Sequence, residues 1–451
     1  MKLKIKKTDI ENLLNGFSGN YREIFIESSV KSTLRLVNGV VESPSTSEES
    51  GFSVLSRTGE EKFFKASSEL KDIKKEVRTF AKTFDLTKQS DKVNLGGEES
   101  LMLKNRNLEK DIRKMSTYLD ACKEILKNED LIISYNIYFL LSEKNYIVGN
   151  TKGAFIQDSQ YYNSFYIILT GNKGDIYEEV FEKITGTEIL KEISKKNVVS
   201  SINKAIRKLK LSLNGLSSPS GVMDVIIGNE AGGTIIHEAV GHGLEADLMN
   251  SSVYKGKIGE KVASSGVNVV DNPTLKGKRG AYDFDHEGTK TEKTYLIKDG
   301  ILISYLHNNA TGELFDVKST GHGRRESYKY TNLVRMGVTY LESGKDKKED
   351  MIKSIKNGIY VSTMGSGQVN EVTGDFVFQI TLGYEIKNGK LGKVIRGATL
   401  SGNGLEMLNN IEGIGDCLDF FDGGTCGKGQ LMPVSDATPT IHVKLKVTGK
   451  N

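Results

Sequence analysis

The chain of 451 residues has no uninterrupted run of about 18 apolar residues, the length that a membrane-spanning helix requires. We therefore expect no transmembrane helix. The N-terminus is basic, but polar Thr8, Asp9 and Glu11 follow where a signal peptide would carry an apolar segment. We expect no signal peptide either.

Cysteine is scarce. An odd number of three cysteines without regular spacing excludes a disulfide framework and indicates a reducing cytoplasm. Cys122 falls on the apolar stripe of a helix predicted over residues 105–127, beside Met115 and Leu119 at helical spacing. This pattern predicts a buried packing thiol.

An excess of either charge is also absent, since 62 basic residues face 58 acidic ones for a net charge of +4. Dedicated nucleic-acid binders usually show a more basic and more clustered charge, so the composition argues against that class. With 37% hydrophobic and 27% charged residues, the chain fits a soluble globular protein of two or three domains.

Glycine is sparse in one half of the chain: 13 of the 48 glycines lie in residues 1–220 and 35 in residues 221–451. The shift predicts an α+β protein with an N-terminal mixed α/β domain at 1–212, a linker at 213–221 and a β-rich C-terminal domain at 222–451. Strand patterns occur at 23–28 and 32–42. The C-terminal half contains two predicted hairpins, 295–302 and 384–391, with Asp-Gly and Asn-Gly turns of type I′. No cluster of ligand-type residues precedes residue 220, which favours a scaffold or substrate-flanking role for the first half.

Of only six histidines, two lie in the stretch 229–247, which reads NEAGGTIIHEAVGHGLEAD. His237 and His242 offer imidazoles, the commonest protein ligands for transition metals, and Glu238 lies beside the first. A carboxylate in that place can act as general base to a metal-bound water. The familiar motif is H-E-x-x-H, whereas this chain has H-E-x-x-x-H.

The extra residue in this motif has a structural consequence. Residues five apart lie about 140° apart around an α-helix, so His237 and His242 cannot share one ion from an ideal helix. We expect either a π-type bulge or unwinding near Gly241 and Gly243, where glycine permits unusual backbone angles. The alternative is two unrelated histidines, one packed and one exposed.

A catalytic zinc site needs three protein ligands and one open position. Cys426 lies in a glycine-rich segment, residues 423–430, predicted to be a turn that brings its thiol close to another element. Lys428 nearby would favour the thiolate. The alternative is an inert thiol in a tight turn. The other candidates for the third ligand are Cys417, His286, His307, His322 and His442.

The segment HEAVGHGLEAD at 237–247 resembles the core of the TldD/PmbA family of metallopeptidases. Further segments agree: GHGRRES at 321–327, GIY at 358–360 with GSGQV at 365–369, and GGTCGKGQ at 423–430 followed by MPV at 432–434. These segments span most of residues 222–443 in the family's order, while the N-terminal half matches weakly. The intact H-E-x-x-x-H motif is similar to the TldD branch. His286 stands where we would expect an acidic residue in relatives.

The resemblance implies that His237, His242 and Cys426 are the ligands of one zinc ion (Zn2+) per subunit and that Glu238 is the general base. We expect a donor to the oxyanion or substrate among His322, Arg324 and Arg325, unless these form a solvated or salt-bridged loop. Cys417 is a weaker ligand candidate, because a fourth protein ligand would close the site.

The resemblance also implies cleavage of unfolded or extended peptides inside a chamber formed by two subunits. The partner would be a PmbA/TldE-like subunit in a heterodimer or a second copy in a homodimer. A peptide could add as a strand to a sheet edge of the C-terminal half, with loose side-chain specificity. The alternative function is a non-catalytic, zinc-stabilised peptide-binding or regulatory protein.

Overall fold

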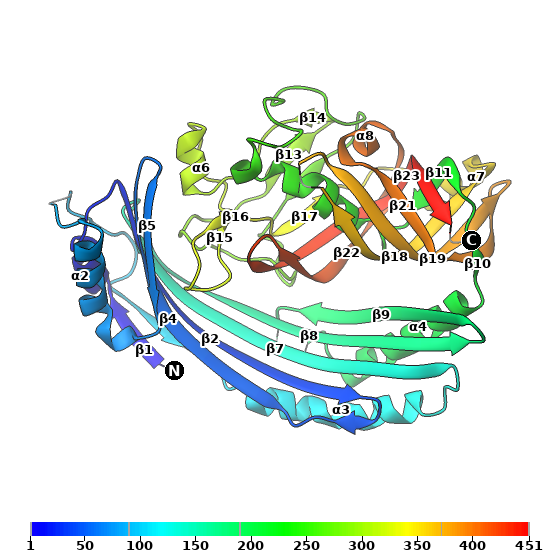
Figure 1. Ribbon diagram of the computed structural model, residues 1–451, viewed down its shortest axis with the longest axis horizontal. Helices are drawn as coiled ribbons and strands as arrows, with labels where there is room; N and C mark the ends of the chain where they lie inside the picture. The colour runs from blue at the N-terminus through cyan, green and yellow to red at the C-terminus, as the bar shows by residue number, and fades with distance from the viewer. Residues whose placement is uncertain (1, 89–90, 189–190, 371, 450–451) are drawn as a thin grey trace.

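The computed structural model describes residues 2–88, 91–188, 191–370 and 372–449. Two large β-sheets dominate it, and helices cover parts of each (Figure 1). This mixed, strand-rich architecture confirms the predicted α+β class. Within the described residues, no helix combines the length and the apolar character needed to cross a membrane.

The first large sheet is a long curved layer of seven strands with β9 at one end of its order, β5-β4-β2-β7-β8-β9, and β3 beside β2. Helices α3 (Glu109–Leu126) and α4 (Lys195–Leu213) lie along its convex face, and the C-terminal half lies over its concave face (Figure 1). The strands are β2 (Tyr21–Val37), β3 (Val40–Val41), β4 (Ser45–Thr58), β5 (Glu61–Ser67), β7 (Ile132–Asn150), β8 (Phe155–Lys173) and β9 (Ile176–Gly186).

Strand β2 is longer than the sequence predicts, because one strand replaces the two expected at 23–28 and 32–42. The polar pair Ser28-Ser29 breaks the apolar pattern, yet both residues stay in register with β4 and β7. The strand then ends before Asn38 and Gly39, whose φ angles of 47° and 86° turn the chain into β3.

Short elements from the N-terminal part of the chain cover one end of this sheet and form a hydrophobic core with it (Figure 1). Val77 and Phe80 of one helix pack there with Ile10 and Leu14 of another. The elements are β1 (Lys2–Lys6), α1 (Lys7–Leu14), η1 (Leu70–Asp72), α2 (Ile73–Thr83) and β6 (Ser100–Lys104).

The second large sheet has twelve strands and contains the C-terminal core. At its centre β11 pairs in parallel with β18 and antiparallel with β23. Its strands are β10 (Leu216–Ser217), β11 (Gly221–Ile227), β12 (Val269–Asp271), β13 (Thr294–Lys298), β14 (Ile301–Leu302), β17 (Val338–Leu341), β18 (Asn357–Val369), β19 (Asp375–Lys387), β20 (Lys390–Arg396), β21 (Ala398–Asn403), β22 (Ile411–Gly427) and β23 (Leu431–Gly449). The other elements of this half are α6 (Asn309–Leu314), β15 (Gly323–Arg324), β16 (Leu333–Val334), α7 (Lys348–Ser354) and α8 (Gly404–Asn409).

Both predicted hairpins are confirmed. Asp299 and Gly300 join β13 to β14 with φ angles of 48° and 78°. Asn388 and Gly389 join β19 to β20 with φ angles of 49° and 74°. Two consecutive residues with positive φ are the mark of a type I′ turn.

The predicted helix over 105–127 is confirmed as α3, and Cys122 is fully buried on its apolar stripe. Burial raises the pKa of this thiol to about 12, as expected for a packing cysteine. The chain passes from the first sheet to the second between β9 and β10. Because β10 lies inside the predicted linker and pairs with β20, the division at 213–221 stays a prediction.

Candidate metal centre

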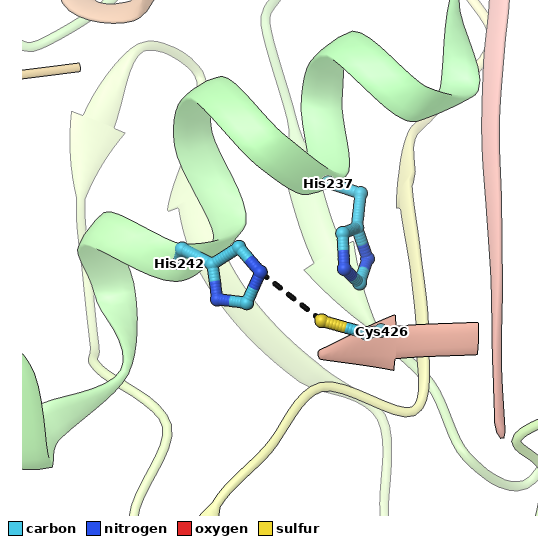
Figure 2. Close-up of side chains that lie close together, drawn as sticks. All are labelled: His237, His242 and Cys426. Atoms are coloured by element: carbon cyan, nitrogen blue, oxygen red, sulfur yellow. Dashed lines mark hydrogen bonds between the residues drawn. The ribbon is translucent and has the colours of Figure 1, made fainter. Parts of the chain in front are cut away.

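His237, His242 and Cys426 come together in a buried group, with one potential ligand atom from each lying within 4.8 Å of the others. Figure 2 shows the two imidazoles on one helical segment and the sulfur on a strand that faces them. The His242 Nε2 to Cys426 Sγ distance is 3.1 Å, and the two imidazole ring centroids are 5.1 Å apart. All three side chains are nearly inaccessible to solvent.

The helix bearing the histidines departs from α-geometry where the sequence requires it. After α5 (Gly233–Ile236), residues His237–Gly241 form a π-helical turn and His242–Leu244 a 3₁₀ turn. The backbone N–H of His242 donates to the carbonyl of His237, five residues earlier. The wider turn places both imidazoles on one side of the helix, which confirms the predicted π-type bulge.

Glycine is needed here for space rather than for unusual backbone angles. Gly241 keeps helical angles, φ −59° and ψ −49°, so the prediction based on conformational freedom is wrong. A Cβ at Gly241 would lie 2.1 Å from Met336 Sδ, and one at Gly243 would lie 2.9 Å from the Tyr254 ring. These glycines let neighbouring segments pack against the bulged helix.

Cys426 lies near the end of β22, paired with Met432 of β23, rather than in a turn. The hairpin turn itself is confined to residues 428–430. Arg335 fixes the position of this hairpin, because its guanidinium donates to the carbonyl of Cys426 at 2.9 Å and to that of Gln430 at 2.7 Å. The sulfur is therefore presented from a paired strand, a rigid support.

The charges in this group favour a thiolate between two imidazoles. Burial alone would raise the pKa of the Cys426 thiol, but His237 and His242 outweigh it and lower that pKa to about 5. Burial opposes protonation of both imidazoles, but their pKa values are raised. At His237 the negative charge of Cys426 outweighs the effect of burial, and at His242 mainly that of Glu245 does so.

The residues fit a zinc ion. Within the described residues, neither ring nitrogen of buried His237 has a hydrogen-bond partner, which is costly unless a bound metal ion takes up its lone pair. Two imidazoles and one thiolate form a ligand set that zinc prefers. Among the described residues the group has three members, so a zinc ion held by them would keep a fourth coordination position for water or substrate.

The centre opens onto a cavity of about 1270 Å³ that lies between the two sheets and is lined by His237, Glu238 and Cys426, among others. Glu238 is 31% exposed, and its Oε2 lies 3.7 Å from His242 Nε2. A carboxylate beside the ligands and in contact with solvent is placed to exchange protons with a bound water.

Sequence reasoning missed Glu245, which supports the centre from behind. Its Oε2 lies 2.9 Å from His242 Nδ1 and 3.0 Å from Lys428 Nζ. Lys428 also donates to Asp247 at 2.7 Å. The sequence led us to expect that this lysine would act chiefly on the Cys426 thiol, but its contacts are with Glu245 and Asp247. The signal was present in the sequence, since Glu245 follows His242 by three residues.

His322, Arg324 and Arg325, predicted to contact substrate, are buried and committed to protein contacts. His322 Nε2 lies 3.0 Å from Asp271 Oδ1. Arg324 donates to carbonyl oxygens of neighbouring segments, and Arg325 pairs with Glu23. None of the three is among the described residues that line the cavity. These ion pairs match the alternative, a salt-bridged loop, and substrate contact by the three residues stays an untested prediction.

The other candidate ligands lie outside the group of three. His286 is buried against the first sheet and accepts the backbone N–H of Arg325 at 2.8 Å. Cys417 is exposed, with its sulfur 3.9 Å from the Asn229 amide. His307 Nδ1 lies 3.3 Å from the Thr311 hydroxyl, and His442 Nε2 lies 3.1 Å from Asp224 Oδ1.

The sequence of the chain is similar to a known protein family and to several of its members. Residues 220–449 match the family model described as the PmbA/TldA metallopeptidase C-terminal domain. A metalloprotease TldD homolog of Buchnera aphidicola (subsp. Acyrthosiphon pisum) is 32% identical over 94% of this chain and 92% of its own length. A metalloprotease TldD homolog of Haemophilus influenzae is 40% identical over 55% of this chain, a match that spans 52% of that relative. A zinc metalloprotease TldD homolog of Saccharolobus solfataricus is 29% identical over 76% of this chain and 77% of its own length.

Solved structures share the fold. A protein of Thermotoga maritima superposes with a TM-score of 0.77 over 95% of this chain and 96% of its own, at 18% identity. TldE from Thermococcus kodakarensis superposes with a TM-score of 0.74 over 98% of this chain and 100% of its own, at 19% identity. At these identities the similarity is one of fold.

Proposed function

Because this chain belongs to the PmbA/TldD family of metallopeptidases, we propose that it is a zinc-dependent peptidase that cleaves unfolded or extended peptides. The observation that carries the proposal is the group of His237, His242 and Cys426 at the wall of a large cavity. Its buried, unpartnered imidazole and low-pKa thiolate suit a metal that keeps one position open.

In this proposal His237, His242 and Cys426 hold the zinc ion. Zinc bound there would polarise a peptide carbonyl and acidify a water molecule, supplying a nucleophile near neutral pH. Glu238 is the general base: its carboxylate takes a proton from the attacking water and passes it to the departing amine. The partial exposure of Glu238 toward the cavity supports this proton transfer.

The cavity offers an edge on which an extended peptide could lie. Strand β9 is the last strand of its sheet, and residues 175–185 all line the cavity. Its outer edge has no strand partner within the described residues. A peptide that added there would be held through main-chain hydrogen bonds, so unfolded segments of varied sequence could bind. This edge belongs to the first half of the chain, not to the C-terminal half expected from the sequence.

We further propose that residues 1–212 form the scaffold of a chamber, with residues 213–221 as linker and residues 222–451 as the metallopeptidase domain. The chamber would be completed by a PmbA/TldE-like subunit or by a second copy of this chain in the cytoplasm. The similarity in fold to TldE supports a related partner.

The test is the variant Glu238→Ala. Because the metal ligands remain, the variant should bind one zinc per chain, while cleavage of an unstructured peptide should fall by about 10²–10⁴-fold, the usual contribution of a general base. Exposed Glu98 lies outside the cavity, and Glu98→Ala should retain both zinc and activity. Undiminished cleavage by Glu238→Ala would refute the proposed mechanism.

The second candidate is a non-catalytic protein whose zinc only holds the bulged helix against β22. Under that alternative, chelation would unfold the C-terminal half and no peptide would be cut at any zinc concentration. Zinc content, peptide cleavage and thermal unfolding, each measured with and without chelator, distinguish the two functions.

A further inference from the structure

One face of strand β9 and the residue before it carry alternating acidic and aromatic side chains. Asp175, Tyr177, Glu179 and Phe181 are all exposed, and all line the cavity. Tyr177 is 66% exposed and Phe181 42%, unusually high values for aromatic residues beside a cavity. We call these four residues the β9 stripe.

The alternation follows from strand geometry, because every second side chain of a strand points to the same side. The intervening residues Ile176, Val180 and Ile184 pack into the core beneath α4. The β9 stripe therefore occupies the other face. Phe181 is held by a stacked contact with Tyr166 of β8, with ring centroids 5.7 Å apart.

The cavity as a whole is acidic, although the chain carries a net charge of +4. The described residues that line it include nine acidic and four basic side chains. Three of these cations are in ion pairs with carboxylates that also line the cavity, and the fourth, Lys183, has an interaction of its own. Lys204 pairs with Glu230 at 3.3 Å, Lys208 with Glu182, and Arg396 with Glu178 at 3.2 Å. These cations are thus already neutralised by acidic residues of the same cavity.

Two carboxylates of the β9 stripe have no such compensation. Asp175 and Glu179 form no ion pair with any described residue of the chain. Across the cavity, exposed Asp419 contributes a further negative charge, and the cation that interacts with it, Lys204, already pairs with Glu230. The uncompensated charge lies where an extended peptide would run along β9.

We propose that the cavity selects cationic peptide segments, with lysine or arginine side chains bound along the β9 stripe; this rests on the proposed peptidase function and names its substrate class. Each element of the stripe suits a cation. Carboxylates attract ammonium and guanidinium groups, and exposed tyrosine and phenylalanine rings bind them through cation–π contacts. A cavity lined by one sign of charge also concentrates ligands of the opposite sign.

The experiment compares three unstructured peptides of equal length and identical central sequence, flanked by lysine, glutamine or glutamate. Their binding to the zinc-loaded full chain carrying Glu238→Ala is measured by fluorescence anisotropy, so that cleavage does not interfere. We expect the lysine peptide to bind at least about tenfold more tightly than the glutamate peptide at about 0.01 M salt. The difference should shrink toward equality at about 1 M salt, where the screening length is about 3 Å.

Variants of the β9 stripe test whether its two carboxylates cause the preference for the lysine peptide. Asp175→Asn with Glu179→Gln should reduce the lysine-to-glutamate preference to about threefold or less, and Asp175→Lys with Glu179→Lys should reverse it. Glu98→Gln, an exposed substitution outside the cavity, should leave the preference unchanged. Equal binding of the three peptides, or a preference that persists in the Asp175→Asn/Glu179→Gln variant, would overturn the inference. A charge preference without cleavage by the unsubstituted chain would uphold it while refuting the peptidase function.

Discussion

At the residue scale, the proposed metal centre would depend on Glu245 as much as on its three proposed ligands. The Glu245 carboxylate accepts a hydrogen bond from the Nδ1–H group of His242, which fixes the imidazole tautomer and leaves Nε2 facing Cys426. Burial opposes its ionisation, but His242 and Lys428 hold the pKa of Glu245 at about 2, so it is charged at neutral pH. Lys428 follows Cys426, the proposed third ligand, by two residues. The Glu245–Lys428 ion pair therefore joins the helix to the hairpin.

This arrangement makes a prediction about zinc affinity. Glu245→Gln removes the charge that stabilises His242 and Lys428, and Lys428→Met removes the other half of the ion pair. Each variant should bind zinc about 10–100-fold more weakly, the usual effect of losing a residue that orients a ligand. Competition with a chromophoric chelator measures the affinity.

The two substitutions act on one interaction, so their effects should not add: the double variant should lose little more than either single variant. Lys318→Met, at an exposed position, is the matched control. Zinc affinity within about twofold of the unsubstituted chain in both single variants would show that the ion pair does not orient the ligands.

At the scale of elements, the π-helical turn is held by its neighbours. Helix α8 begins against it at Gly404, where an added Cβ would lie 2.1 Å from the carbonyl oxygen of Ala239 and 2.8 Å from its carbon. Both atoms are backbone and cannot move without displacing the turn. Close approach of α8 therefore requires glycine at this position.

Gly404→Ala should consequently destabilise the protein by about 1–3 kcal/mol and weaken zinc binding, because the displaced turn bears His237 and leads directly into His242. Gly392→Ala on β20 is the control, since its added Cβ would have no atom nearer than 3.4 Å, and it should change stability by no more than about 0.5 kcal/mol. Denaturant unfolding and chelator competition measure the two effects. A stable Gly404→Ala protein with unchanged zinc affinity would contradict this role of α8.

Elements defined by local chemistry could be predicted from the sequence. For His237 and His242 to share one ion, their five-residue spacing required either a π-type bulge or local unwinding, and the structure has the first. Asn388-Gly389 specified a hairpin turn. Features set by distant partners could not be predicted. The continuity of β2 through Ser28-Ser29 comes from its pairing with β4 and β7. The sequence near Cys426 likewise does not show that a long hairpin carries the sulfur to the helix.

The burial of Arg324 and Arg325 likewise could not be predicted from the sequence. Arg324 and Arg325 lie in a polar, glycine-containing segment that is typical of exposed binding loops. Arg324 is buried among segments of the C-terminal half, where it donates to the carbonyl oxygens of Met336 and Pro433. Arg325 packs against the first sheet, where it pairs with Glu23, about 300 residues earlier in the chain. No local pattern indicates such a partner.

At the scale of the whole molecule, the first sheet and the C-terminal half are joined through a buried polar interface. Tyr146 of β7 donates to the carbonyl of Phe284 at 2.6 Å, and Asn150 donates to that of Glu287 at 2.6 Å. Arg325 pairs with Glu23 of β2. The interface fixes the C-terminal half over the concave face of the first sheet (Figure 1).

Glu287 makes this interface sensitive to pH. Burial, reinforced by the charges of Asp285 and Glu23, raises the pKa of the Glu287 carboxyl to about 8 from an ordinary value of 4.5. Between about pH 4.5 and about pH 8, the Glu287 carboxyl is therefore protonated in the folded state and ionised in the unfolded state. The stability this proton contributes is complete below about pH 4.5 and is lost as the pH rises through about 8.

Glu287→Gln should remove this pH dependence, because glutamine resembles the protonated acid and cannot ionise. The variant and the unsubstituted chain should have similar stability near pH 5. Above that pH the variant should become the more stable, by up to about 1.4 kcal/mol per pH unit, until about pH 8. Thermal and denaturant unfolding from about pH 5 to about pH 9, at one fixed zinc concentration, measure the difference, with Glu98→Gln as the exposed control. Parallel stability profiles for Glu287→Gln and the unsubstituted chain would mean that Glu287 is ionised within the interface and that its charge is compensated by Arg325.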